Sequence, residues 1–486
     1  MSRKRSVRVR WEVSGVLLLA VVCGAASAGT GALLPGNARA DDWVFVTTTD
    51  YITGSSAVIR PGPPLTVECP LRALHSDAVA RYVDPYVYVV NRKGGDNIQI
   101  LDPANNFSTV RQFSVGAGSD PHDILVLSPT KAYVTRYNTN VIWIVNPSLG
   151  IQTGSIDLSG LADADGLAEI DMMCRAGNRA FVTVQRLNRN NYWVPVGQSY
   201  VAVINTQTDA LLDCDPVAPG VQPIEMTGTN PYSDIQLDPY TGSLYLSSVG
   251  YWGLRDGGIE KIDPVGLQSE GIIFTQTAAG GDMTDVEIDG GKRGFAIVSD
   301  DDFYTVLISF DAETGVKTGT LYDPNAYVIQ DIEVSPWGDL YVADRTPTVP
   351  GIRIYDVFTN TQLTATPIDV CLPPFDITFN LPVQTGIGDP PTALTVVLLG
   401  DAYPNPFNPA TTIPFTLAGA GRVTLRVYDA LGRPVRTLLA GARPAGDYHL
   451  AWDGRDDDGR ALPSGVYFVR LEAEGKTATR KITILK

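Results

Sequence analysis

Residues 283–299, MTDVEIDGGKRGFAIVS, decide the fold, because two short runs of apolar residues flank a glycine-rich turn. The same pattern recurs at residues 329–345, IQDIEVSPWGDLYVADR, with an acidic residue, a strand, a turn and a second strand. Apolar and polar residues that alternate over short runs between Gly, Pro and Asp are typical of antiparallel strands. The chain therefore repeats a β-hairpin unit.

Further copies of this unit cover most of the chain. They are HSDAVARYVDPYVYVVNR (75–92), PHDILVLSPTKAYVTRY (121–137), LAEIDMMCRAGNRAFVTV (167–184), YSDIQLDPYTGSLYLSS (232–248) and a partial PFDITFN (374–380). Each copy opens on an acidic residue, at spacings of 46, 46, 65, 51, 46 and 45: Asp77, Asp123, Glu169, Asp234, Asp285, Asp331 and Asp376. A third strand follows each full copy, and a less regular fourth comes after it. Four antiparallel strands in about 45 residues predict the blades of a β-propeller.

The two ends of this region predict how the ring closes. Before Asp77 the chain supplies WVFVTTTDY (43–51), SSAVIRPG (55–62) and LTVECPLRAL (65–74), which are typical of second, third and fourth strands. The segment DITFN (376–380) is a first strand without successors. Joining these pieces makes a seventh blade and removes the open sheet edges that promote aggregation.

Two copies carry a family resemblance. AYVTRYNTNVIWIVNP (132–147) and LYVADRTPTVPGIRIYDVFTN (340–360) resemble the YVTN family of seven-bladed propellers. The resemblance implies an all-β fold, a seven-bladed β-propeller over residues 41–380, and says little about a ligand.

The last part of the chain has a different pattern. Its strand-like blocks contain YPNPFNP (403–409), VYDALGR (427–433), WDGRDDDG (452–459) and SGVYF (464–468). In this order they resemble the type A C-terminal sorting domain of the type IX secretion system, a small Ig-like β-sandwich that is also similar to the flagellar-hook-cap Ig module. The matching positions are Tyr403, Pro404, Asn405, Pro406, Phe407, Asn408, Pro409, Gly432, Trp452, Gly465, Tyr467 and Lys486. The resemblance implies delivery by secretion and sorting machinery, through residues 401–486 joined by a linker at 381–400.

The first residues indicate export. Five basic residues precede an apolar run at 16–22, and Ala26-Ser27-Ala28 supplies the small residues that signal peptidase needs. We expect a signal peptide at 1–28, with 38–40 as the second candidate cleavage site. Cys23 follows the bulky Val22, which argues against lipidation. No later segment is long and apolar enough to cross a membrane. We expect a secreted or cell-surface protein that passes through the periplasm of a Gram-negative-type bacterium.

Composition and motifs argue against some classes of function. With 37 Lys and Arg against 53 Asp and Glu, the net charge of −16 argues against nucleic-acid partners. The sequence has no GxSxG, HExxH, CxxC or phosphate-loop motif, so we expect binding rather than catalysis.

The seven acids should line the axial channel at one face of the propeller. As a cation site they would bind Ca²⁺ through carboxylate oxygens. In the alternative interpretation, each acid accepts hydrogen bonds from backbone N–H groups of its own turn. Asp300-Asp301-Asp302 leaves the same choice between a metal site and a solvated turn.

Other candidate ligand-binding residues should lie on that face. Two enlarged loops carry the pairs Tyr192-Trp193 and Tyr251-Trp252, which either stack on a glycan or peptide or fold back over the blades. His75 and His122 precede ring acids in neighbouring blades. They are either a metal or acid–base pair at the channel mouth or ordinary turn residues.

Four cysteines follow the predicted signal peptide. Cys69 and Cys371 precede innermost strands of the two blades that meet at the closure, so we predict a disulfide between them. Cys174 and Cys214 should lie at opposite ends of their blade.

Together these features predict an exported propeller that binds an extracellular glycan or protein as an adhesion module. One alternative is a surface hydrolase or lactonase that uses a cation at the acidic ring. A second is a structural component of a surface layer.

Overall fold

The computed structural model describes residues 42–485, apart from 63, 239–240, 290–291, 358, 381–396, 418–420, 430–431, 444–445, 458–459 and 474–475. The predicted signal peptide, most of the predicted linker and Lys486 lie outside the described residues.

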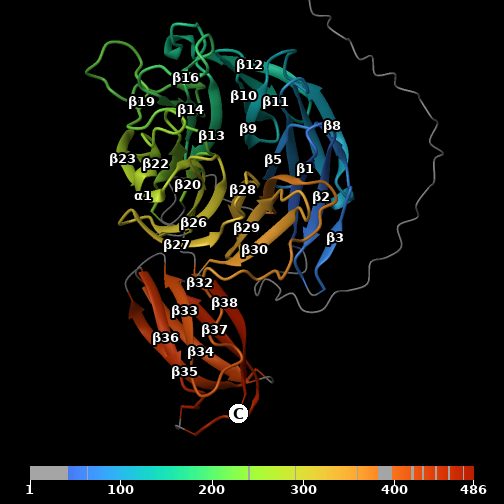
Figure 1. Ribbon diagram of the computed structural model, residues 1–486, viewed down its shortest axis with the longest axis vertical. Helices are drawn as coiled ribbons and strands as arrows, with labels where there is room; N and C mark the ends of the chain where they lie inside the picture. Colours follow the sequence, from blue (N-terminus) through green and yellow to red (C-terminus); the bar gives the residue numbers. More distant parts are fainter. Residues whose placement is uncertain are drawn as a thin grey trace, which may run out of the picture. The chain divides into compact units, whose positions relative to one another are not determined.

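Residues 44–379 form a seven-bladed β-propeller, in which antiparallel sheets surround a central axis (Figure 1). From the axis outward, the first blade along the chain contains β5 (Ala78–Val83), β6 (Tyr86–Asn91), β7 (Asn97–Asp102) and β8 (Ser108–Ser114), and the second contains β9 (Pro121–Ser128), β10 (Lys131–Arg136), β11 (Val141–Asn146) and β12 (Ile151–Asp157). The third contains β13 (Ile170–Ala176), β14 (Arg179–Val184), β17 (Tyr200–Asn205) and β18 (Ala210–Leu211), with β19 (Ile224–Glu225) also on β17. The next three are β20 (Gln236–Leu237), β21 (Leu244–Ser248), β22 (Gly258–Asp263) and β23 (Gln268–Thr275); β24 (Asp282–Asp289), β25 (Arg293–Ser299), β26 (Thr305–Asp311) and β27 (Val316–Tyr322); and β28 (Ile329–Val334), β29 (Asp339–Asp344) and β30 (Gly351–Asp356).

The described residues contain little else. The loop between β14 and β17 holds a short hairpin, β15 (Leu187–Asn188) and β16 (Val194–Pro195), and helices are limited to α1 (Gln276–Ala279) and two 3₁₀ turns at Pro103–Asn105 and Ser159–Leu161. Within the described part of the chain, no helix is long and apolar enough to cross a membrane.

The seventh blade closes the ring in the predicted way. Its innermost strand, β31 (Pro374–Phe379), pairs with β1 (Val44–Thr49), which pairs with β2 (Gly54–Arg60). The outer edge is formed by β3 (Thr66–Glu68) and β4 (Ala73–Leu74) on β2. One strand therefore comes from the C-terminal end of the propeller and the rest from its N-terminal end.

A disulfide reinforces this closure. Cys69 lies just after β3, and Cys371 lies in the connection that leads into β31. The two residues are disulfide-bonded, with their Cα atoms 5.8 Å apart. This is the pairing that the sequence predicted. Cys174 and Cys214 are free.

The hydrophobic core lies between neighbouring sheets. The second strand of each blade is covered on both sides, which explains continuous apolar runs such as YVYVV in β6 and the fully buried β1. A representative cluster joins Tyr133 and Ile144 of one blade to Ile170, Val182 and Ile204 of the next. Because each blade shares a core with both of its neighbours, the ring is stabilised as one unit.

The C-terminal domain is an Ig-like β-sandwich. One sheet contains β32 (Val397–Leu399), β33 (Thr411–Leu417) and β36 (Gly446–Trp452), and the other contains β35 (Pro434–Arg443), β34 (Gly421–Asp429), β37 (Gly465–Ala473) and β38 (Lys476–Ile484).

The positions of the predicted sorting motif build this domain. The Phe407 ring is buried against Trp452, and Thr483 donates its N–H to the Asn405 side chain. Tyr467 is buried, and its hydroxyl donates to the carbonyl of Pro463. Gly432 adopts φ 76°, the left-handed conformation that the turn between β34 and β35 needs. These contacts give five of the twelve motif positions a structural role.

Candidate functional site

One face of the propeller gathers the exposed aromatic side chains. In every blade, the connection into the innermost strand and the turn between the second and third strands lie at the same end of the sheet. All the exposed aromatic residues described in the propeller lie in these two kinds of connection: Tyr51, Tyr192, Trp193, Tyr232, Tyr251, Trp252, Phe303, Tyr304 and Tyr327. We call this end the aromatic face. The turns at the opposite end expose aliphatic side chains such as Val83, Leu149 and Val265.

The two predicted Tyr-Trp pairs belong to the aromatic face and remain partly exposed. Relative exposures are 93% for Tyr192, 47% for Trp193, 39% for Tyr251 and 41% for Trp252. The Tyr251 hydroxyl also donates to the carbonyl of Pro195, 3.1 Å away in the neighbouring loop. The two loops thus contact one another and still leave ring surface exposed.

Neighbouring rings extend this surface across blades. The Trp252 ring lies 5.5 Å from the Tyr232 ring, edge to face, and 6.5 Å from Phe303. Tyr232 is partly exposed, yet burial raises its pKa to about 12.

His122 lies at the centre of a hydrogen-bonded chain. Its Nδ1 is 2.6 Å from Oδ1 of buried Asp171 in the next blade. Gln185 donates to the other Asp171 oxygen at 2.8 Å, and the Tyr137 hydroxyl donates to Gln185 at 2.5 Å. A buried carboxylate at Nδ1 orients the imidazole and leaves Nε2 to accept a proton. The Nε2 atom lies 3.9 Å from Asp120.

An aromatic stack holds this imidazole. The His122 and Tyr137 rings are parallel, with centroids 4.1 Å apart. The Trp193 ring lies 6.3 Å beyond Tyr137, and the Arg189 guanidinium lies within 5.0 Å of both. One of the predicted Tyr-Trp pairs and one predicted histidine therefore belong to a single site.

The predicted histidine pair does not form. His75 Nδ1 accepts from the N–H of Asp77 in its own turn, whereas His122 contacts the following blade. The contacts described for the two histidines have no residue in common.

The ring acids link the innermost strands of adjacent blades. In four blades, the carboxylate of the ring acid accepts a hydrogen bond from a backbone N–H group in the innermost strand of the next blade. The donor lies one residue after the position that aligns with the acid. These bonds run from Met173 to Asp123, from Ile332 to Asp285, from Ile377 to Asp331 and from Ala80 to Asp376, at 2.8–3.1 Å. Two of these acids also accept a backbone N–H next to them in the chain, as the own-turn alternative predicted: Asp123 from Ile124 and Asp285 from Val286, both at 2.9 Å. The bond to the next blade is an additional contact that neither alternative named. We call the four bonds between blades the channel ladder.

Three of the seven predicted ring acids lie outside the ladder: Asp234, whose carboxylate pairs with Arg81 at 2.9 Å, and Asp77 and Glu169. In the blades of Asp77 and Glu169, the N–H donors of the ladder are Ala80 and Met173. The residues that align with the ring acids of other blades are therefore Val79 and Met172. Asp77 instead pairs with Arg92 at 2.5 Å. Glu169 is buried and accepts from Arg189 at 2.7 Å. The prediction that Asp77 and Glu169 line the ring was wrong, because both acids precede the strand that faces the channel.

Arg81 is the cation of the channel, and no sequence signal distinguished it. Its guanidinium contacts Asp123 at 3.0 Å, Asp234 at 2.9 Å and Asp376 at 3.4 Å, so it links three blades. Burial would lower the pKa of Arg81, but these carboxylates outweigh it and raise the pKa well above its ordinary value.

Several carboxyl groups of the channel have raised pKa values, including that of Asp376, which also contacts Arg81. Burial raises the pKa of Asp285 to about 8 and that of Asp376 to about 7. Burial also raises the pKa values of Asp331, Glu287 and Glu333 well above their ordinary range, and the neighbouring carboxylates add to this effect.

The metal candidates show other contacts. Asp300 accepts from the N–H groups of Asp302 and Tyr304, and Asp301 pairs with Arg255 at 2.7 Å. Over the described ranges, no group of three or more His, Cys, Asp or Glu side chains is placed to hold a metal ion. The channel carboxylates already bind amides and Arg81, so their arrangement does not fit a Ca²⁺ site.

Comparison with known proteins assigns the C-terminal domain. Residues 408–477 match the FlgD Ig-like domain family. The basal-body rod modification protein FlgD of Salmonella typhimurium is 41% identical over 54 residues, which are 11% of this chain and 23% of that protein. The chain thus spans about a quarter of the length of the curated relatives that it matches.

Solved structures resemble the propeller. A putative 6-phosphogluconolactonase from Bacteroides fragilis matches with a TM-score of 0.51 and 15% identity, over 70% of this chain and 98% of that one. PorZ of Porphyromonas gingivalis, a surface component of its type IX secretion system, matches with a TM-score of 0.41 and 14% identity, over 89% of this chain and 63% of that one. At such identities the first likeness shows the fold alone.

Proposed function

We propose that this protein is an exported β-propeller that binds an extracellular glycan or protein on its aromatic face. The observation that carries the proposal is the confinement of the exposed aromatic rings to one end of the propeller. Tyr and Trp are enriched in binding surfaces because a rigid ring buries a large area at a small entropic cost. The disulfide supports export, since such bonds persist in oxidising compartments.

The C-terminal domain is the proposed delivery module. Its motif positions resemble a type IX sorting domain, and its fold is the Ig-like sandwich that the resemblance implies. We propose that secretion and sorting machinery recognises this domain and brings the propeller to the cell surface. The two domains then divide transport and binding between them.

An array of glycans and peptides probed with the full chain tests the binding role. Trp193→Ala and Trp252→Ala should each weaken binding to any positive spot at least tenfold. Leu149→Ala, on the opposite end, is the matched control and should leave binding unchanged. Binding that survives both tryptophan substitutions, or an array without positive spots, would contradict the proposal.

The His122–Asp171 pair favours a second candidate function, hydrolysis of a lactone or other ester. His122 Nε2 would take a proton from water as the water oxygen attacks the carbonyl carbon. The resulting imidazolium would then protonate the leaving alkoxide as the C–O bond breaks. A lactone panel tests this with His122→Ala and Asp171→Asn, and turnover that His122→Ala leaves unchanged would rule the dyad out.

A further inference from the structure

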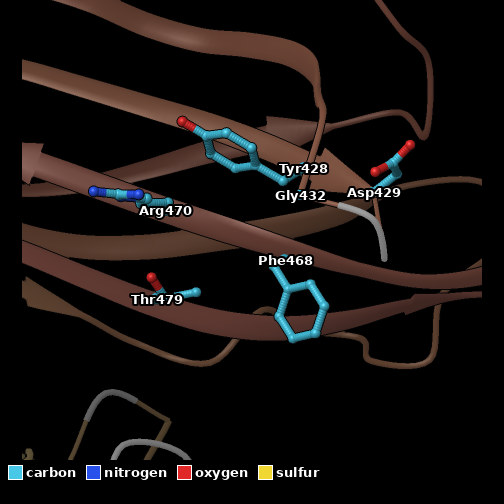
Figure 2. A pocket seen from close by; sticks show the side chains of 6 residues that line it. All are labelled: Tyr428, Asp429, Gly432, Phe468, Arg470 and Thr479. Carbon is cyan, nitrogen blue, oxygen red and sulfur yellow. The ribbon is translucent and has the colours of Figure 1, made fainter.

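The C-terminal domain has a pocket on the side of its larger sheet that faces away from the core. Its volume is about 290 Å³, and Figure 2 shows the side chains that surround it. The lining comes from three strands and the turn after β34: Tyr428, Asp429, Gly432, Phe468, Arg470 and Thr479. Val427 and Val469, which alternate with this lining, are buried in the core. We call this site the basic pocket.

The turn after β34 fixes one wall of the basic pocket. Asp429 accepts from the N–H of Arg433 at 3.0 Å and from its guanidinium at 2.7 Å. The Asp429 carboxylate is therefore engaged by its own turn. Phe468 stands directly opposite Tyr428 on β37, which brings two aromatic rings to the pocket.

Positive charge is concentrated beside these rings. Arg426 stands directly opposite Arg470 in the β34–β37 pair, and Lys481 stands opposite Phe468 in the β37–β38 pair. Like charges that face each other across strands are unfavourable without an anion nearby. Arg470 has one carboxylate partner, Glu472, at 2.9 Å. Among the described residues no ion pair is found for Arg426 or Lys481.

The charge of the domain contrasts with that of the chain. Residues 401–486 contain 12 Lys and Arg against 9 Asp and Glu, whereas the whole chain has a net charge of −16. A volume near 300 Å³ is at the lower limit for drug-sized ligands and suits one or two side chains of a peptide. Aromatic rings in the pocket, next to Arg426 and Lys481 on the same side of the sheet, favour a segment that combines an apolar or aromatic side chain with carboxylates.

We propose that the basic pocket binds an acidic peptide segment of the machinery that sorts this protein. The proposal rests on the proposed sorting role of the C-terminal domain. An apolar or aromatic side chain would enter between Tyr428 and Phe468, and neighbouring carboxylates would pair with Arg426, Arg470 and Lys481. The pocket would then be a specific recognition surface on a domain in which other motif residues serve folding.

Binding is tested with the purified full chain and a fluorescein-labelled octapeptide of alternating Glu and Tyr. We expect measurable anisotropy binding that weakens at least tenfold in Arg426→Glu/Arg470→Glu and as the salt concentration rises. Arg426→Lys/Arg470→Lys should stay within threefold of wild type, and so should the single charge-reversal control Arg455→Glu, which lies in another loop. Thr479→Glu places a carboxylate in the pocket while keeping both arginines, and should also weaken binding. No binding by wild type at 100 µM peptide, or binding only to phosphatidylglycerol vesicles, would overturn the assignment.

Surface delivery in the native bacterium separates this proposal from the one on which it rests. Deletion of residues 397–486 should abolish surface exposure of the propeller, and so should Arg426→Glu/Arg470→Glu, whereas Arg455→Glu should be delivered normally. Delivery of the charge-reversed protein at wild-type levels, with the deletion retained inside, would overturn the pocket and keep the sorting role. Normal delivery of the deletion would refute the sorting role itself. Melting curves of each purified variant establish that the domain remains folded.

Discussion

Removing the disulfide between Cys69 and Cys371 should lower the stability of the propeller substantially. The bond joins residues 302 positions apart, so it greatly reduces the number of conformations that the unfolded chain can adopt. In the chain-entropy model, a loop of this length corresponds to about 5.7 kcal/mol at 25 °C. The native ring of Cys69→Ser/Cys371→Ser should still close, because β31 pairs with β1 and Trp43 donates its N–H to Asn380. The double substitution should therefore lower the free energy of unfolding mainly by raising the conformational entropy of the unfolded state.

Urea unfolding followed by tryptophan fluorescence measures this loss. With a slope of about 3 kcal/mol per molar urea, the midpoint of Cys69→Ser/Cys371→Ser should fall by about 2 M. Cys214→Ser removes a half-buried free thiol and is the control, with an expected change below about 1 kcal/mol. Non-reducing peptide mapping should recover Cys69 linked to Cys371. An unchanged midpoint in the double variant would refute the reasoning, since it would mean that the bond does not constrain the unfolded chain.

Three further predictions concern the ring. Asp331→Ala should destabilise the propeller by about 1–3 kcal/mol, because the N–H of Ile377 loses its acceptor. The loss of stability should be the same with and without 5 mM Ca²⁺. If Ca²⁺ stabilises the wild type and Asp331→Ala abolishes that effect, a cation site is favoured instead. Stability should fall as pH rises from about 4 to 8, because Asp285 has a folded pKa of about 8 and so keeps in the native state a proton that the unfolded chain releases; Asp285→Asn should flatten this dependence, and urea midpoints measured at several pH values decide it. A chain that ends at Pro373 should melt well below one that ends at Asn380, because only the longer chain retains β31 and its buried side chains; equal melting temperatures would contradict the observed closure.

The blades and their closure could be predicted from the sequence because they depend on local patterns. Short apolar runs between turn residues recur at a steady spacing, and the unmatched strands at the two ends complement each other. The pairing of Cys69 with Cys371 followed from the closure together with the register of two fourth strands. The blades and the closure needed only the order of the strands.

The ring acids could not be placed in this way. At the start of β13 the pairing shifts between Ile170 and Met173, whereas β5 pairs with β6 without a shift. Such bulges change the number of residues between the turn and the channel, and a short slip moves a side chain to a different position. Counting from the turn therefore selected Asp77 and Glu169, although Val79 and Met172 occupy the ring.

The site around His122 was beyond local reasoning for a different reason. Its partner Asp171 lies 49 residues away in the next blade, and the contact forms only when the two innermost strands lie side by side. No spacing in the sequence distinguishes Asp171 from neighbouring acids. The aromatic loops, in contrast, could be found because their length and their Tyr-Trp pairs stand out from the repeat.

The channel ladder and the aromatic face have complementary roles. In four blades a carboxylate-to-amide bond ties the innermost strand to the next, and Arg81 joins its own blade to three others. A rigid ring lets the loops differ from blade to blade without loss of the fold. Under the proposed function, the channel contacts would hold the scaffold while the aromatic face binds the ligand.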